Sequence, residues 1–255
     1  MRKKTEIQQP FFLQKQIISI LLLLIMLILE YETKNQSTTI YLAIFSYLLI
    51  TLVTTFLPWI RSKINYPYIL HNFLFILPFY LVLEHTQFIY TSINKESVIS
   101  GLLGFIGVGL LLYSKKKEQI FALSSVESKI PLSKKDFIYK FTITLYSIIG
   151  EEIWFRLFLI PVLIPYFGAY AILISSLCFV HIHYINRWAN TIYSVKSYMN
   201  QFVLSLILSS VYFITSSFLI VLLLHILYDL IYFILLVKRL LINSDEKQGD
   251  FFNDY

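Results

Sequence analysis

The sequence predicts an all-α fold, a polytopic bundle of transmembrane helices. Of the 255 residues, 57% are hydrophobic and 14% are charged, whereas soluble domains are about 45–50% apolar and about 25% charged. A water-soluble fold of this composition would have too little polar surface to cover its core. A bilayer accepts an apolar exterior, and the hydrophobic residues fall into separate segments that suit membrane-spanning helices.

We expect about eight spans, forming one membrane domain that comprises residues 1–255. The hydrophobic segments are residues 13–30, 38–58, 68–92, 97–114, 137–164, 168–185, 197–214 and 216–237. The third contains Pro78, Glu84 and His85, and the seventh begins in the polar stretch 194–201. Glu30 and Glu32 follow the apolar run of residues 17–29 without a small-residue cleavage site, so we expect an uncleaved span there rather than a signal peptide.

The distribution of basic residues predicts the orientation of these spans. With eight spans, 16 of the 21 Lys and Arg residues lie in segments on one side of the membrane, and only Lys34 and Lys95 lie on the other. Because basic loops remain in the cytoplasm, both termini are predicted to be cytoplasmic. Anionic lipid headgroups balance the net charge of +6, so the lipid bilayer is the expected partner and no nucleic acid is needed.

The longest polar segment, residues 115–136, is expected to be a cytoplasmic loop that divides the chain. Residues 1–114 hold four spans, residues 137–237 hold a core of four more, and residues 238–255 form a cytoplasmic tail. The single cysteine, Cys178, excludes an intramolecular disulfide and is expected to pack. Glycines in the fourth span are expected to let another helix approach closely; they are Gly101, Gly104, Gly107 and Gly109.

Ionisable side chains inside a membrane are costly, so they mark functional sites or paired contacts. In the first half they are sparse, and Glu84 and His85 are expected to make helix contacts or to lie near an interface. The second half carries a denser set on three of its four spans: Glu151, Glu152, Arg156, His181, His183, His225 and Asp229. Polar groups brought to a similar depth by three helices predict a shared interior cavity.

Helical spacing separates the two adjacent glutamates. Glu152 and Arg156 are four residues apart, which is the spacing of an intrahelical ion pair, and we expect this pair to support the architecture of the site. Glu151 is rotated from Glu152 by about 100° and is therefore free to face the cavity. A carboxylate in that position suits a general base that acts on water.

The same spacing sorts the histidines. His225 and Asp229 are four residues apart and share one face of the last span. Phe179 lies one turn before His183 and is expected to wall the pocket beside it. His181 is rotated from His183 by about 200°, so only one of the two can face the cavity. Spacing alone leaves open which one does.

At these residues the sequence resembles the CAAX prenyl protease and bacteriocin-processing family, the membrane glutamic endopeptidases also called the Abi family. Three family motifs are matched in order within residues 137–237. Glu-Glu-x-x-x-Arg is matched by Glu151–Arg156, Phe-x-x-x-His by Phe179–His183, and His-x-x-x-Asn or Asp by His225–Asp229. Each motif alone is common, but the ordered set is specific, and the resemblance selects His183 over His181.

The resemblance implies a catalytic role for four residues. Glu151 and His183 would activate a water molecule for attack on a peptide carbonyl, and His225 with residue 229 would stabilise the oxyanion. Position 229 is Asp, whereas the better-studied relatives have Asn, and an ionised carboxylate cannot donate a hydrogen bond. Asp229 is therefore expected to act either protonated or by orienting His225.

No metal and no other cofactor is expected. The zinc-protease signature His-Glu-x-x-His is absent from the sequence. A cluster of Glu, His and Asp can in principle bind a divalent cation, but the resemblance points to metal-free hydrolysis.

Together these observations favour an intramembrane endopeptidase that cleaves a peptide or membrane protein near the cytoplasmic side. The Lys-, Ile- and Asn-rich composition indicates an AT-rich bacterial genome, so a bacterial plasma membrane is the expected location. A bacteriocin self-immunity protein, with or without proteolysis, is an alternative implied by the resemblance. A proton-coupled transporter is a second alternative, but its polar residues would spread across the bilayer and between related halves.

Overall fold

A computed structural model of the chain describes residues 38–61, 73–76, 95–185 and 194–252, and the structural statements below concern these residues. Within them every regular element is a helix and no strand occurs, so the all-α prediction is confirmed. The predicted first span, 13–30, and most of the third, 68–92, lie outside the described residues.

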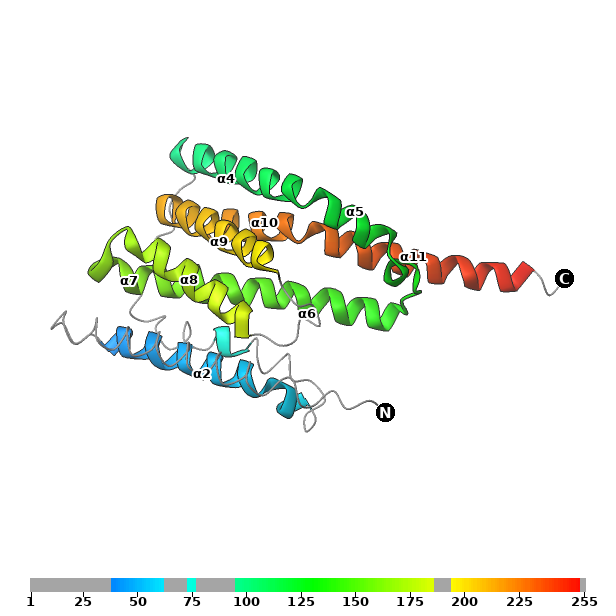
Figure 1. Cartoon of the computed structure of the whole chain (residues 1–255), viewed down its shortest axis with the longest axis horizontal. Helices are drawn as coiled ribbons and strands as arrows, with labels where there is room; N and C mark the ends of the chain where they lie inside the picture. The colour runs from blue at the N-terminus through cyan, green and yellow to red at the C-terminus, as the bar shows by residue number, and fades with distance from the viewer. Residues whose placement is uncertain (1–37, 62–72, 77–94, 186–193, 253–255) are drawn as a thin grey trace.

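The helices run side by side as a bundle (Figure 1). Helices α4, α9 and α10 pack together, α8 contacts both α9 and α2, and α6 contacts α10 and α11. In chain order the elements are α2 (Thr38–Arg61), α4 (Lys95–Ser114), α5 (Lys116–Ser124), the 3₁₀ turn η1 (Val126–Lys129), α6 (Lys134–Glu152), the π-helix η2 (Ile153–Leu159), α7 (Ile160–Phe167), α8 (Tyr170–Ile185), α9 (Val195–Thr215), α10 (Phe218–Tyr228) and α11 (Leu230–Phe252).

Several of these helices have the length and composition of membrane spans. Among the described residues, α4 and α9 can each cross a membrane, and α10 with the first part of α11 would form a third span that is bent by 56°. Shorter apolar helices occupy Ile40–Thr54 and Tyr170–Ile185. The chain is thus a helical membrane protein, while the eight spans and the cytoplasmic termini stay predictions.

The segment 115–136 differs from the loop expected from its polarity. It contains α5 and η1, and α6 already begins at Lys134. Lys, Glu, Gln, Ala and Leu within α5 are good helix formers, so a polar composition did not prevent a helix here. Ser133 caps the next helix, because its Oγ accepts a hydrogen bond from the backbone N–H of Asp136 at 3.1 Å.

The last predicted span, 216–237, is broken rather than continuous. Asp229 ends α10 with a φ of −90° and a ψ of 5°, and α11 starts at the next residue in a different direction. Asp229 still lies one turn after His225, because its backbone N–H donates to the His225 carbonyl at 3.1 Å. The span itself is bent directly after Asp229, which the hydropathy of residues 216–237 did not predict.

An aromatic core fixes η2 against α2 and α8. Trp154 and Phe155 of η2 are fully buried. The Trp154 ring stacks on Tyr47 of α2, with ring centroids 5.4 Å apart, and Phe155 meets Phe179 of α8 edge-to-face at 5.1 Å. In a bilayer such close packing is a main source of helix association. This core therefore holds the segment that directly follows the paired glutamates.

The glycines of α4 allow close packing against α9 and α10. A Cβ added at Gly104 would lie 2.7 Å from Leu224 Cδ1 and 2.9 Å from Val211 Cγ2. A Cβ at Gly107 would lie 3.0 Å from Ile207 Cδ1, whereas one at Gly109 would meet nothing within 4 Å. The packing role expected from the sequence thus falls on Gly104 and Gly107.

Gly104→Val is expected to destabilise the bundle, because the new side chain would overlap Leu224 and Val211. Overpacking of a well-packed core costs about 1–3 kcal/mol, so the thermal unfolding midpoint in detergent should fall. Gly109→Val is the matched control, with open space around the new side chain. Equal losses of stability in the two variants would contradict a packing role for Gly104.

Candidate active site

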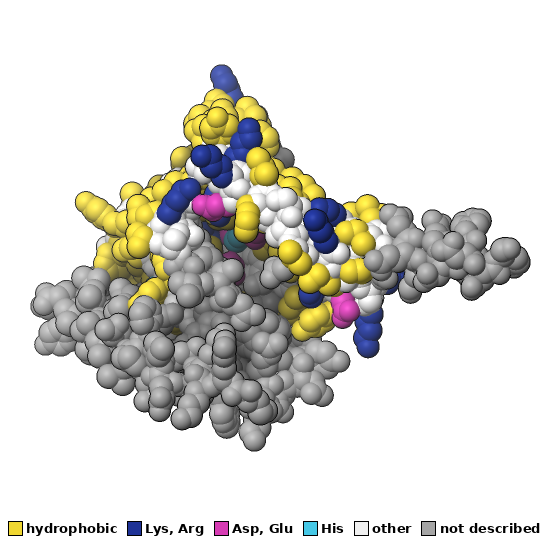
Figure 2. All heavy atoms as spheres, turned by 45° about the vertical axis from the view of Figure 1, so that its right-hand side comes forward, with side chains coloured by type: hydrophobic (Ala, Val, Ile, Leu, Met, Phe, Trp, Pro, Cys, Tyr) yellow, Lys and Arg dark blue, Asp and Glu magenta, His cyan; other side chains and the backbone are white. Residues whose placement is uncertain are grey.

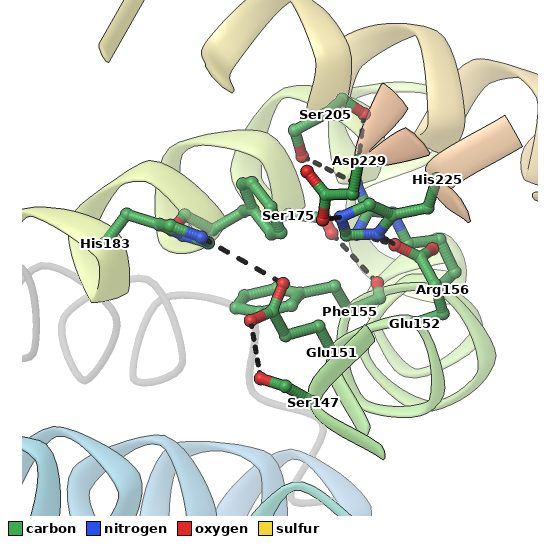
Figure 3. A network of polar contacts seen from close by, with 11 residues as sticks. Ser147, Glu151, Glu152, Phe155, Arg156, Ser175, His183, Ser205, His225 and Asp229 are labelled. Carbon is green, nitrogen blue, oxygen red and sulfur yellow. Dashed lines mark hydrogen bonds and ion pairs between the residues drawn. The ribbon is translucent and has the colours of Figure 1, made fainter. Parts of the chain in front are cut away.

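The helix geometry changes at the paired glutamates. Glu151 and Glu152 are the last residues of α6, and the wider π-helix η2 begins at Ile153. Ser175 of α8 donates a hydrogen bond to the Phe155 carbonyl of η2 at 2.9 Å. Short π-helical segments occur frequently at functional sites. The two carboxylates directly before this segment point in different directions (Figure 3), as expected for adjacent residues of a helix.

Glu152 forms the ion pair that its spacing predicted. Arg156 Nη1 lies 2.9 Å from Glu152 Oε1, and both side chains are fully buried. Arg156 Nη2 also donates to Ser205 Oγ of α9 at 2.9 Å. The guanidinium carbon lies 4.9 Å from the centroid of the Phe179 ring, within the range of a cation–π contact. Arg156 therefore links η2 to α8 and α9.

Glu152 has a second partner that spacing along one helix did not reveal. His225 Nδ1 of α10 lies 2.5 Å from Glu152 Oε1. A carboxylate oxygen only accepts, so Nδ1 carries the hydrogen of this bond. The carboxylate thus lies between a guanidinium and an imidazole, and it holds His225 as well as Arg156. The expectation that Glu152 only supports the architecture was incomplete.

Glu151 faces the other histidine motif. Its Oε2 lies 4.0 Å from His183 Nε2, and the two side chains are 18% and 19% exposed. His183 Nδ1 lies 2.9 Å from the Phe179 carbonyl, which can only accept, so Nδ1 is the donor. In the neutral ring this leaves Nε2 as an acceptor directed at Glu151. Ser147 completes the group by donating to Glu151 Oε1 at 3.4 Å.

Phe179 separates the two histidines. Its ring centroid lies 4.3 Å from that of His183 and 6.2 Å from that of His225. The same ring contacts Arg156. Phe179 therefore packs between the two halves of the polar network, which agrees with the walling role expected for it.

Asp229 lies at the edge of the network. Its Oδ2 is 3.8 Å from His225 Nε2, beyond hydrogen-bond distance, and its side chain is 35% exposed. Lys115, between α4 and α5, donates to the hydroxyl of the neighbouring Tyr228. Burial lowers the pKa of Lys115, while the charges of Asp229 and Glu118 oppose that shift. Asp229 thus has a cation nearby and no close bond to His225.

His181 is directed away from this group, as only one of the two histidines on this helix can face it. His181 Nδ1 lies 2.5 Å from Tyr47 Oη of α2, and both residues are buried. Glu84 and His85, named from the sequence as further polar residues, lie outside the described residues.

The network is reached through a depression in the surface. Figure 2 shows histidine and acidic side chains inside this hollow, with Lys and Arg side chains on the surface beside it. Within the part of the chain that the structure describes, no three His, Cys, Asp or Glu side chains are arranged to hold a metal ion. The arrangement offers a carboxylate and an imidazole facing each other, with a second, charge-compensated imidazole nearby.

Arg156→Met is expected to lower the free energy of unfolding, by up to about 3–5 kcal/mol, because the buried Glu152 carboxylate loses its guanidinium partner and keeps only the contact with His225. The double variant Glu152→Met with Arg156→Met should recover a large part of this loss, since neither charge is then buried. Thermal unfolding in detergent measures both. A double variant less stable than Arg156→Met would show that the buried charge is not the cause.

The comparisons with known proteins concern this same region. Residues 134–231 match the family model described as Type II CAAX prenyl endopeptidase Rce1-like. The matched range begins with α6 and ends just after Asp229, so it contains the whole polar network. No curated protein and no solved structure matches the chain. Residues 134–231, and with them the whole polar network, are therefore similar to the Rce1-like CAAX prenyl endopeptidases.

Proposed function

We propose that the protein is an intramembrane endopeptidase in which Glu151 and His183 activate a water molecule without a metal ion. The observation that carries the proposal is the pairing of Glu151 Oε2 with His183 Nε2 at 4.0 Å in a partly exposed position. That separation is too long for a direct hydrogen bond and short enough for one water molecule to contact both atoms. The substrate is a peptide or a membrane protein.

The two side chains act on different hydrogens of this water. His183 is fixed as an acceptor at Nε2, because its Nδ1–H is bonded to the Phe179 carbonyl. Glu151 accepts the other hydrogen and takes the proton as the water oxygen attacks the peptide carbonyl. The protonated Glu151 then gives its proton to the departing amine. The water is consumed, the peptide C–N bond breaks, and Glu151 returns to its starting state.

His225 stabilises the negative oxygen that forms during attack. With Nδ1–H bonded to Glu152, a protonated ring presents Nε2–H as a charged donor. The Glu152 carboxylate favours this imidazolium, and Arg156 compensates the carboxylate in turn. In this mechanism Glu152 orients His225, a role that the sequence analysis considered for Asp229. Asp229, at 3.8 Å from Nε2, contributes charge at the edge of the site.

We place the reaction in a bacterial plasma membrane, with the network facing the cytoplasmic side. The basic residues around the hollow support that orientation, because positive charge concentrates in cytoplasmic segments. A substrate segment would have to reach the hollow from the bilayer or from the aqueous side.

Glu151→Gln is expected to reduce kcat/KM by about 100- to 10,000-fold, because the amide keeps the shape of the side chain and cannot take a proton. The measurement uses purified full-length protein in detergent with a library of quenched-fluorescent octapeptides. Mass spectrometry of the peptides released in membranes gives an independent readout. Cleavage that is unaffected by Glu151→Gln in both assays would exclude the proposed function.

The two histidines of α8 provide a matched control. His183→Ala should abolish cleavage as Glu151→Gln does. His181→Ala should leave kcat within about threefold once activity is corrected for folded protein, because His181 contacts Tyr47 rather than the network. The opposite order of effects would assign the catalytic role to His181.

Asp229→Asn is expected to keep kcat within about tenfold of the wild type, because Glu152 rather than Asp229 orients His225 and the Asp229 carboxylate lies 3.8 Å from Nε2. Glu152→Gln should lower kcat of the folded fraction by about 100-fold or more, since His225 loses its carboxylate partner. Steady-state kinetics with the same octapeptide compares them. A large loss in Asp229→Asn with normal activity in Glu152→Gln would show that Asp229 orients His225.

A further inference from the structure

Helix α9 borders the network and carries two buried amides with atoms that have no hydrogen-bond partner. Within the described part of the chain, Asn200 Nδ2 and Gln201 Oε1 are both unpartnered. Asn200 is 9% exposed and Gln201 is 8% exposed. Burying such a group without a partner destabilises a protein, so the feature calls for a compensating role.

Gln201 lies on the face of α9 that borders the network. It is one helical turn before Ser205, whose Oγ accepts the hydrogen bond from Arg156. Arg156 pairs with Glu152, which holds His225. Gln201 and Ser205 therefore share the face of α9 that contacts Arg156.

Asn200 lies on the neighbouring face, toward the junction of α4 and α5. It is one turn after Lys196, whose Nζ binds Glu118 of α5 at 3.1 Å. At that junction Lys115 donates to the hydroxyl of Tyr228, the residue before Asp229. The two amides thus flank the network, one toward Arg156 and one toward the end of α10.

The depth of the two amides matches that of the catalytic histidine. The ring of Tyr198 meets that of Tyr184 of α8 at 5.7 Å, which places these residues at one level. Helices α8 and α9 are consecutive and pack against each other. With a rise of about 1.5 Å per residue, Gln201 lies roughly one turn deeper, beside the turn of α8 that carries His181 and His183.

We propose that Asn200 and Gln201 bind the main chain of the peptide substrate beside the catalytic group. One amide offers a donor and the other an acceptor, and a peptide backbone presents the complementary carbonyl and N–H. The proposal rests on the proposed protease function. It also defines the conformation of the bound substrate. In a helix the backbone N–H and C=O groups bond one another, so the substrate segment that binds α9 must be unwound or extended.

Recognition of this kind is independent of substrate side chains. It accounts for the one unpartnered atom of each amide in the described structure, Asn200 Nδ2 and Gln201 Oε1, since the substrate supplies the missing contacts. Removing the amides should then have opposite effects on binding and on stability. Substrate binding should weaken, whereas the protein alone should become no less stable, because the unsatisfied polar groups are gone.

The test uses Asn200→Leu and Gln201→Met, which nearly keep the side-chain shapes. With the best-cleaved member of the octapeptide library, each variant should raise KM by about tenfold, the size of one lost hydrogen bond to substrate, with kcat within about threefold. The thermal unfolding midpoint should be unchanged or higher. Ser209→Ala is the control, because Ser209 Oγ is also buried and unpartnered but lies two turns further along α9; its KM should stay normal.

An ester scan of the octapeptide identifies the bond directly. Replacing each peptide N–H in turn by oxygen removes one donor, and at one position the wild type should lose about tenfold in kcat/KM. At that position the ester should not lower kcat/KM of Gln201→Met any further, because this variant already lacks the acceptor of the bond. A normal KM in both variants, or a lower unfolding midpoint with the same ester profile as the wild type, would overturn the proposal. Absence of any Glu151-dependent cleavage would overturn the proposed function and the proposal with it.

Discussion

The site depends on one buried chain of charges, in which Arg156, Glu152 and His225 are linked by contacts of 2.9 Å and 2.5 Å. Burying an isolated charge is far more costly than burying a paired and hydrogen-bonded one. The chain joins η2 to α10, and Arg156 extends it to Ser205 of α9. Separation of α10 would remove the carboxylate partner of His225, and separation of α9 would leave the buried Arg156 Nη2 without its acceptor Ser205. The same contacts that orient His225 therefore also specify how the helices pack.

The two adjacent carboxylates differ in burial and in partners. In any helix Glu151 and Glu152 point in different directions, but here η2 begins directly after them and is fixed by buried aromatic rings. Glu152 is fully buried among charges, whereas Glu151 keeps partial exposure opposite His183. Partial exposure suits a group that must meet water, and full burial suits one that must hold a neighbour in place.

Spacing along the sequence predicted the contacts between residues of the same helix. Four-residue spacing gave the pair of Glu152 with Arg156, the contact of Phe179 with His183, and the opposite direction of His181, because helix geometry determines each of them. The bond from Glu152 to His225 joins residues 73 positions apart, and no pattern along one helix encodes it. Polarity likewise misled the expectation for residues 115–136, because hydropathy reports contact with lipid and does not exclude a polar helix.

Asp229 lies one helical turn after His225, at the end of α10, and its backbone N–H donates to the His225 carbonyl at 3.1 Å. In the proposed mechanism a carboxylate bonded to His225 Nε2 would compete with the oxyanion for that nitrogen. The end of α10 instead leaves its Oδ2 at 3.8 Å, partly exposed, with Lys115 and Tyr228 at the adjoining helix junction. The strong contact of His225 is made on the opposite side of the ring, at Nδ1, by Glu152. Glu152 therefore sets the orientation of the His225 ring and leaves Nε2 without a hydrogen bond to either carboxylate, as the proposed role in oxyanion stabilisation requires.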